Sequence, residues 1–434
     1  MLVEQKQNKT IRPTSVYTLS AEETNQITAE LENVITAGGL TPSASSTTQV
    51  AEAIDNLIYP DKWNKPAEWP DIRGGALQNS VYFLVAHSAD YSSYPQFSVY
   101  ATIGSSGTYD VYVDGIKQAT TASGTETVLT WSTLALTSGW DVTYPSALHT
   151  HIVRVTPTSQ ANKITAIRLN QTPGWNELHH GVLWAHFALD YALSLDAFMG
   201  SAYNGIAPIL EVITANNDVL RTTSANNFLR QSKIKYFTPV WDCSSHISTM
   251  ASAFMNCTDL KGKIIIRNMP TNLSSGYYAR IFQSAESIEK IIFEGGCVQA
   301  LFYVFDKCKA LKEINGMIPS NNNMDNIYWT ENSAYENPMY LYFSQVTNAA
   351  KFDLQKNPML KGLTVSDQAP FGGASPQINV SNTGLDRAAL INLFNSMPTV
   401  SASQVCNITG ATGASSLTAE DLAIATNKGW TITR

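Results

Sequence analysis

Histidines are the side chains of this sequence best suited to chemistry, because imidazole serves as a proton carrier and as a metal ligand near neutral pH. His149 and His151 alternate along a predicted strand and therefore share one face. Two ligands make a poor metal site, since zinc takes four. His179, His180 and His186 lie in an aromatic-rich stretch that lacks H-E-x-x-H spacing. We therefore expect structural roles for these histidines and no bound metal.

Carboxylate pairs give two weaker indications of chemistry. Asp110 and Asp114 share a strand face, but calcium needs six or more oxygen ligands and the remainder are not visible. Glu331 and Glu336 are the only pair near aromatic residues that could hold a sugar for glycoside cleavage, and we expect them to be solvated loop charges. Gly104–Gly107 is predicted to be a turn, and no G-x-S-x-G elbow is present. The sequence predicts no catalytic residue, no cofactor and no enzymatic activity.

Cysteine spacing does not predict a disulfide framework or a zinc site. The five cysteines are odd in number and include no C-x-x-C pair. They stand at Cys243, Cys257, Cys297, Cys308 and Cys406. Cys257 and Cys308 occupy the same position of a repeat, where we expect a small buried side chain.

Length and composition limit the class of protein. The 434 residues predict two to four domains, and 44% hydrophobic residues argue against general disorder. Only 15% of residues are charged, so Ser, Thr, Asn, Gln and Tyr must cover the surface. The net charge of −7 argues against a nucleic-acid partner. No apolar stretch approaches the roughly 20 residues of a membrane span, and the first 15 residues lack the apolar region of a signal peptide.

The clearest pattern is a repeat of a phenylalanine, a small residue and two aliphatic residues. Its three copies are Phe254, Cys257, Leu260 and Ile264; Phe282, Ala285, Ile288 and Ile291; and Phe305, Cys308, Leu311 and Ile314. The phenylalanines are about 28 and 23 residues apart, within the range of leucine-rich repeats. Stacked units cover apolar edges that one unit cannot bury. The repeat therefore predicts an extended solenoid whose core includes Phe254, Cys257, Leu260, Phe282, Ile288, Phe305, Cys308 and Leu311.

An Asn-rich, aromatic insertion at 319–345 interrupts the repeat, which resumes at Leu354, Asn357, Leu360 and Leu363. Insertions in solenoids become loops on one face, often the binding face. Rigid rings with nearby amides suit the recognition of carbohydrate or protein. The candidate contact residues are Tyr328, Trp329, Tyr335, Tyr340 and Tyr342. The alternative is that these rings fill the solenoid interior beneath a long loop.

The remaining segments complete a multidomain, β-rich fold with some α-helix. Residues 1–62 read as an N-terminal arm with two amphipathic helices for attachment or oligomerisation, the first beginning after Ser20 and ending at Gly38. Residues 63–172 contain alternating segments that predict a β-sandwich of the immunoglobulin or polycystic-kidney-disease type. Residues 173–384 form the solenoid, and 385–434 form an α/β cap in which Thr418 and Asp421 begin a helix. The predicted sandwich strands are 80–86, 96–102, 109–115, 127–131, 151–157 and 163–169.

Two segments resemble those of tailed-bacteriophage proteins. AGGLTPSASSTTQVAEAI at 37–54 is similar to linkers of tail fibres, and GASSLTAEDLAIATNKGWTI at 413–432 is similar to the final cap of phage virion proteins with leucine-rich repeats. The F-x-x-C-x-x-L units also resemble repeats of BspA-like bacterial adhesins. The W-G-D-G-T stretch usual in phage sandwich modules is missing, which leaves the type of sandwich open.

The resemblance implies a non-enzymatic structural component of a phage virion, in the tail, collar or fibre region. The N-terminal arm would bind other virion proteins, as part of a homo-oligomer, and the outer domains would make assembly contacts or bind a host glycan or surface protein. A BspA-like surface adhesin is the alternative, although we see no signal peptide. A tail-associated polysaccharide depolymerase is the third.

Overall fold

The computed structural model divides the chain into two units, Met1–Lys62 and Trp63–Arg434. The residues that it describes are 21–37, 42–43, 49–50, 63–73, 77–87, 96–104, 107–134, 139–144, 146–169, 181–198, 209–245, 247–269, 280–297, 304–317, 326–328, 330, 339–343, 351–365, 371, 376–401 and 404–434. In the first unit, Ala21–Ala37 (α1) forms the expected first helix. Most of the second expected helix lies outside the described residues.

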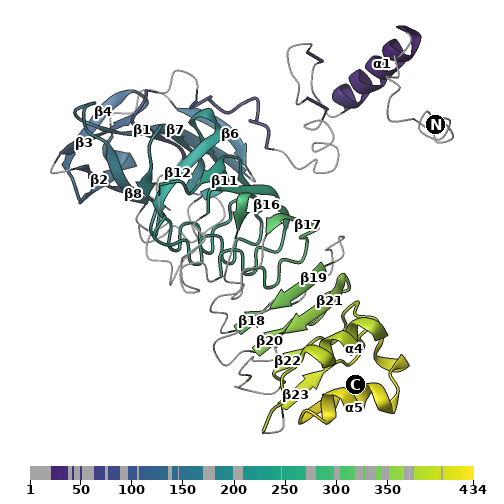
Figure 1. The fold of residues 1–434 in the computed structure, drawn as a ribbon. Coiled ribbons are helices and arrows are strands. Elements are labelled where there is room, and N and C mark those ends of the chain that lie inside the picture. Colours follow the sequence, from purple (N-terminus) through teal and green to yellow (C-terminus); the bar gives the residue numbers. More distant parts are fainter. Residues whose placement is uncertain are drawn as a thin grey trace. The chain divides into compact units, whose positions relative to one another are not determined.

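The second unit is built mainly from two large sheets (Figure 1). Among the described residues the first sheet has eight strands. In bonded order they are Tyr236–Phe237 (β13), Ile209–Ala215 (β11), Gly181–Ala188 (β9), Ser80–His87 (β1), Ser146–Pro157 (β7), Thr108–Val113 (β3) and Ile116–Ala122 (β4), with Trp140–Tyr144 (β6) also paired to β7. The hairpin between β3 and β4 turns at Asp114 and Gly115, whose φ angles are 48° and 82°. Asp-Gly is a favoured pair for such a turn, because both positions need positive φ.

The second sheet has nine strands within the described part of the chain. They are Glu313–Met317 (β17), Ile288–Cys297 (β16), Gly262–Arg267 (β15), Val240–Asp242 (β14), Val219–Ser224 (β12), Leu193–Ser194 (β10), Ile164–Leu169 (β8), Gln96–Ile103 (β2) and Thr125–Thr130 (β5). Short 3₁₀ helices cover Trp131–Thr133 (η3) and Asn216–Asp218 (η4).

Strand direction changes within both sheets, and hydrogen bonding continues through the change. β1 pairs antiparallel with β7 and β9, whereas β9 pairs parallel with β11. Likewise β2 pairs antiparallel with β8, whereas β8 pairs parallel with β10. The sheets pack face to face through rings such as Phe83 and Phe97, whose centroids are 5.8 Å apart. The antiparallel strands thus merge into a β-solenoid of about seven turns without a break in the core.

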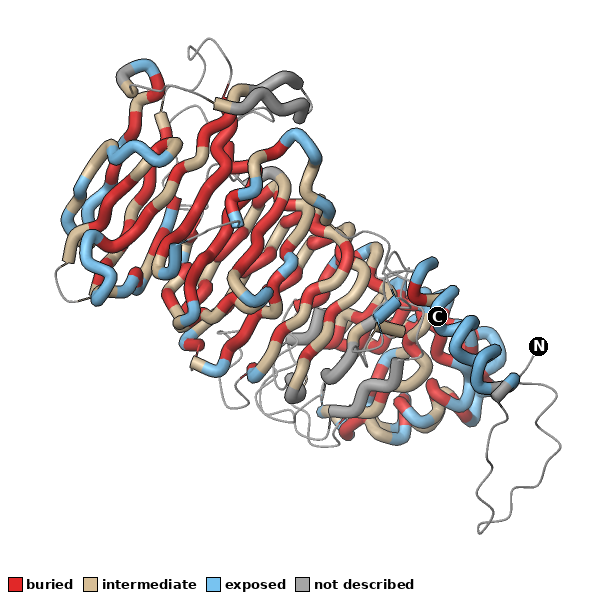
Figure 2. The backbone as a smooth tube through the Cα atoms, turned by 90° about the horizontal axis from the view of Figure 1, so that it is seen from above, coloured by how far each residue is buried: buried red, intermediate tan, exposed pale blue. Residues whose placement is uncertain are grey.

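The solenoid stacks its repeats in register. Ile264 lies beside Ile291, and Ile291 beside Ile314, on adjacent parallel strands. Along β15, buried residues alternate with partly exposed ones (Figure 2). All eight repeat-core residues named from the sequence are at most 2% exposed. The period of the sequence pattern therefore equals one turn of the solenoid.

The C-terminal part contains a smaller parallel sheet and two helices. The sheet consists of Asn326–Tyr328 (β18), Lys351–Asp353 (β20), Ile378–Asn379 (β22), Gln404–Asn407 (β23) and Trp430–Thr433 (β24). Met339–Phe343 (β19) pairs with Leu360–Val365 (β21). The helices are Arg387–Ser396 (α4) and Ala419–Thr426 (α5), with the 3₁₀ turn Ala414–Ser416 (η5) between them. The expected helix start at Thr418 and Asp421 is present as a complete capping box.

Candidate functional site

A strap at residues 63–73 crosses the outer face of the first sheet and forms a second hydrophobic core there. Trp69 and Ile72 of the strap are each 3% exposed and pack with Leu84 and Trp184 of β1 and β9. The ring of Trp63 meets that of Trp184 edge-on at 4.9 Å. The strap thus covers apolar side chains that an outer sheet face would otherwise expose to water.

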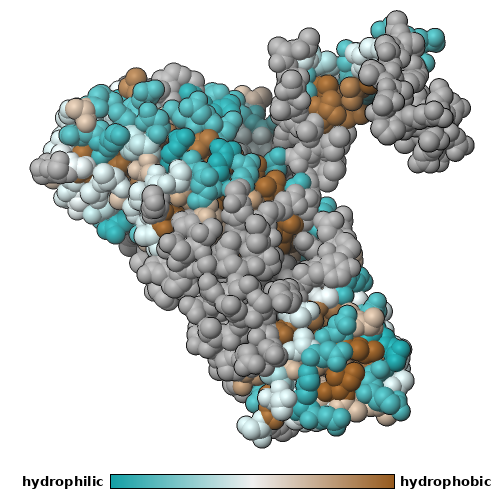
Figure 3. Space-filling model, in the orientation of Figure 1, coloured by the Kyte–Doolittle hydropathy of each residue, from teal (hydrophilic) through white to brown (hydrophobic). Residues whose placement is uncertain are grey.

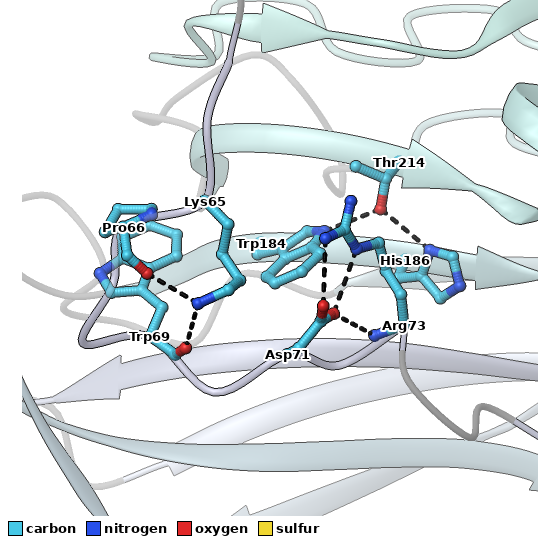
Figure 4. A network of polar contacts seen from close by, with 8 residues as sticks. All are labelled: Lys65, Pro66, Trp69, Asp71, Arg73, Trp184, His186 and Thr214. Atoms are coloured by element: carbon cyan, nitrogen blue, oxygen red, sulfur yellow. Dashed lines mark hydrogen bonds and ion pairs between the residues drawn. The ribbon is translucent and has the colours of Figure 1, made fainter. Parts of the chain in front are cut away.

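Hydrogen bonds and an ion pair within the strap hold its local conformation (Figure 4). The Lys65 ammonium donates to the carbonyls of Pro66 and Trp69 at 2.8 and 2.7 Å. Arg73 pairs with Asp71 through Nη2 and Oδ2 at 3.0 Å, and its guanidinium lies 5.3 Å from the Trp184 ring centroid. The hydrogen bond from Arg73 lowers the pKa of Asp71. The arginine is therefore held by a carboxylate and an aromatic face together.

His186 lies beside this strap as a satisfied structural histidine. Its Nδ1 is 2.9 Å from Thr214 Oγ1 and its Nε2 is 3.2 Å from Asn216 Oδ1. The Trp184 indole donates to the same Thr214 hydroxyl at 2.7 Å. Burial lowers the pKa of His186, which favours neutral imidazole. Both ring nitrogens are hydrogen-bonded, so His186 is poorly placed for proton transfer.

A different histidine group gathers where β1 and β7 pair. His87 lies directly opposite His149 in the ladder, and His151 follows two residues later on β7. The three ring centroids are 4.9–5.5 Å apart, and Trp131 stacks on His87 and His151 at 5.2 and 5.4 Å. The sequence correctly predicted that His149 and His151 share one face, and the structure adds His87 as a third imidazole beside them. Sequence reasoning missed His87, because a strand's partner cannot be read from its own pattern.

Asp110 and Asp114 do not converge on a common point in the way a calcium site requires. Asp110 pairs with Lys117 at 2.8 Å and accepts hydrogen bonds from two threonines, Thr120 and Thr158. Burial would raise the pKa of Asp110, but these three partners outweigh it and lower the pKa. Asp114 instead contacts His151, with 2.6 Å between Oδ2 and Nδ1. Each carboxylate is thus satisfied by its own partners.

The described cysteine thiols are inert packing groups. Cys243, Cys257, Cys308 and Cys406 are buried and reduced. Burial raises the pKa of Cys257 and of Cys406 to about 12, and it raises the pKa of Cys308 as well. The Cys257 and Cys308 thiols donate to carbonyls of the preceding repeat, Leu229 O at 2.9 Å and Phe282 O at 3.1 Å. A thiol held as a neutral donor is a poor nucleophile.

Side-chain amides form a ladder along one corner of the C-terminal turns. Asn379 Nδ2 donates to Asp353 Oδ1 at 3.1 Å, and Asn407 Nδ2 donates to Asn379 Oδ1 at 3.2 Å. These three residues are neighbours on β20, β22 and β23. Burial raises the pKa of Asp353. The ladder links successive turns where their strands end. Its sequence signal is an Asn followed two residues later by Ser or Thr, at Asn379 and Ser381 and at Asn407 and Thr409.

The aromatic insertion is only partly described. Tyr328 lies on β18, and Tyr340 and Tyr342 lie on β19. Trp329 and Tyr335, together with Glu331, Glu336, His179 and His180, lie outside the described residues. On the viewed face, the described surface is mainly hydrophilic over the antiparallel strands, with an apolar group over the C-terminal helices (Figure 3). The proposed contact surface therefore stays a prediction.

Comparison with protein-family models finds no match, and comparisons with curated proteins and with solved structures find none either. None of the described helices is both long enough and apolar enough to cross a bilayer.

Proposed function

We propose that this chain is a non-enzymatic structural component of a phage virion, in the tail, collar or fibre region. The observation that carries the proposal is the division of the chain at Lys62 and Trp63. A short N-terminal unit precedes a large repeat body, and the body begins with a strap that packs against its own sheet. This organisation suits a protein whose N-terminal unit attaches it to a particle and whose repeat body makes further contacts. The resemblance of 37–54 and 413–432 to phage segments supports the same role.

The finer fold assignment belongs to this proposal. We assign the strands from β1 to β8 to a sandwich of the immunoglobulin or polycystic-kidney-disease type, and the later repeats to the leucine-rich class. Support comes from antiparallel pairing among the early strands and from face-to-face packing of β1 on β2. The leucine-rich class is supported by the length of the repeat unit and by the single parallel strand that each unit adds to the sheet.

We propose that the N-terminal unit binds other virion proteins and assembles as a homo-oligomer. Ile27 and Leu31 on α1 are 39% and 41% exposed, which supports a helix that packs against another chain. In the second unit, the segments that carry Tyr328, Tyr340 and Tyr342 would contact a host glycan or surface protein. Buried thiols and fully bonded carboxylates near the sheets favour a binding role over catalysis.

A BspA-like surface adhesin remains the second candidate, because the F-x-x-C-x-x-L repeats fit it equally well. A polysaccharide depolymerase is the third, and it would need carboxylates such as Glu331 and Glu336 on opposite sides of a sugar ring.

Mass spectrometry of purified phage particles from the source tests the proposal, with the copy number of this chain measured. The virion role predicts stoichiometric incorporation of the full chain and loss of incorporation when residues 1–62 are deleted. Circular dichroism of the deletion variant controls for folding. Absence from particles, with the chain recovered from a bacterial surface, would replace the virion role with the adhesin role. Turnover of host polysaccharide by purified protein would favour the depolymerase.

A further inference from the structure

The histidine group at the end of the β1–β7 ladder is arranged as one compact cluster. His87 and His151 are 1% and 0% exposed, and His149 is half-buried. Their centroid separations are 5.5 Å for His87 and His149, 5.2 Å for His87 and His151, and 4.9 Å for His149 and His151. Three imidazoles at such spacing are unusual for simple apolar packing, because each ring carries a polar nitrogen into the protein interior.

His151 provides the second, independent observation. Its Nδ1 is 2.6 Å from Asp114 Oδ2, and the same carboxylate accepts the backbone N–H of Ile152 at 2.9 Å. A His151 ring with a single proton donates it from Nδ1 to this carboxylate, and its lone pair then lies on Nε2. Nε2 is buried and has no hydrogen-bond partner. A carboxylate on one nitrogen and an available lone pair on the other is the arrangement of metal-ligating histidines.

The spacing of the rings fits a shared metal ion. With zinc–nitrogen bonds of about 2 Å and tetrahedral angles, two ligating imidazoles have centroids about 5 Å apart. As the side chains lie, no group of three or more His, Cys, Asp or Glu among the described residues could hold a metal ion, so binding requires the imidazole rings to rotate. His149 is the most exposed of the three rings, and a Cβ at Gly139 would overlap that ring. Glycine at this position thus leaves His149 room beside the cluster.

We propose that His87, His149 and His151 bind one divalent transition-metal ion of the zinc class, with Asp114 as the residue that orients His151. Imidazole ligands suit zinc, copper and nickel better than they suit magnesium or calcium. Trp131 covers the rings of His87 and His151 and excludes water from that side. The ion would join β1 to β7, and Asp114 would connect it to the turn between β3 and β4. A fourth coordination position would take water or an external ligand.

Metal analysis of the tag-free full chain tests this site. The protein is treated with chelator, dialysed against zinc chloride and then buffer, and analysed by elemental mass spectrometry and competition titration. We expect one equivalent of zinc. His151→Gln and His149→Gln should weaken binding by at least 100-fold, and Asp114→Asn by 10- to 100-fold. His186→Gln is the matched control, since His186 is buried with both nitrogens bonded elsewhere, and it should bind like the parent chain.

Two results would overturn the proposal: no retained zinc in the parent chain, or unchanged affinity in a folded His151→Gln or His149→Gln variant. If the substituted chains do not fold, cobalt loading of the parent chain tests whether the three histidines bind a metal ion. The visible spectrum of tetrahedral cobalt and shifted ring-nitrogen resonances of three histidines are expected. An octahedral cobalt spectrum with unshifted histidine resonances would show that the cluster is aromatic packing only.

Discussion

Phe254 and Phe282 stack in parallel, with ring centroids 5.4 Å apart and planes inclined by 3°. Phe305 continues the stack beyond Phe282 at 6.1 Å and 7°. Successive turns of the solenoid therefore touch through the same side chain of each repeat. Phe282 has a ring on both sides, so its removal affects two turn-to-turn contacts at once.

Phe282→Ala should reduce the free energy of unfolding by about 3–5 kcal/mol, because it removes a fully buried ring and leaves a cavity. Val128→Ala is the control, since Val128 is 49% exposed. Urea unfolding followed by circular dichroism measures the loss in the free energy of unfolding, and hydrogen exchange shows which strands are destabilised. Exchange should accelerate first in β15, β16 and β17, because repeat stability depends on nearest neighbours. A loss no greater than that of the control would show that the stack does not stabilise the solenoid.

The repeat could be predicted from sequence because residues one repeat apart in a solenoid lie next to one another on adjacent turns. Ile264, Ile291 and Ile314 occupy one repeat position and lie beside one another on adjacent strands. A local signal was equally clear, namely the capping box at Thr418 and Asp421. This signal depends on residues close together in the chain.

Contacts between distant segments could not be predicted. His87 meets His149 because β1 pairs with β7, and the two strands are more than 50 residues apart. The strap was equally hidden, since Trp63 and Trp69 have no periodic pattern, and their partner Trp184 is more than 100 residues away. A pattern within one strand indicates which face is buried, but not which strand or strap will cover it.

Lys428→Met should destabilise the C-terminal cap by about 1–3 kcal/mol. The Lys428 ammonium donates to the carbonyls of Phe394, Asn395 and Met397 at 3.1, 2.7 and 2.8 Å, which closes the end of α4. Methionine keeps the apolar stem and removes all three bonds. Lys309→Met is the control, because Lys309 forms an exposed ion pair that should contribute little to stability. Thermal unfolding of both variants provides the comparison, and equal midpoints would contradict the capping role.

Asp353→Asn should stabilise the protein at neutral pH. Burial raises the folded-state pKa of Asp353 above its unfolded value. The acid therefore favours folding below the unfolded pKa, and that contribution is lost as the pH rises through the folded pKa. Asparagine does not titrate, and it matches Asn379 and Asn407 in the same ladder. The gain should be largest at neutral pH and disappear toward about pH 4.

Asp110→Asn should show the opposite pH dependence. Hydrogen bonds and Lys117 outweigh burial and lower the folded-state pKa of Asp110. Its carboxylate therefore stabilises the fold above the unfolded pKa, and this contribution is lost as the pH falls through the folded pKa. Urea unfolding of the parent chain and both variants between pH 3 and pH 7 gives the two curves. Matching curves for Asp353→Asn and Asp110→Asn would contradict the assigned pKa directions.

Cys257, Cys308 and Cys406 should resist alkylation in the native protein at pH 8. Burial raises their thiol pKa values, so little thiolate forms, and their side chains are 0% exposed. Iodoacetamide labelling with peptide mass spectrometry, in buffer and in urea, checks this. We expect modification of these three only after unfolding. Rapid native labelling of Cys257 or Cys308 would mean that the repeat opens on the labelling timescale.

Two deletions separate the N-terminal unit from the strap. Removing residues 1–62 should leave the thermal midpoint of the large unit nearly unchanged, because the strap and its contacts remain. Removing residues 1–73 should lower the midpoint and increase binding of an apolar dye. Trp63, Trp69 and Ile72 would be lost, and the outer face around Leu84 and Trp184 would be exposed to water. Equal midpoints for the two deletions would show that the strap does not stabilise the sheet. Unfolding on the shorter deletion would instead place residues 1–62 within the stabilising core.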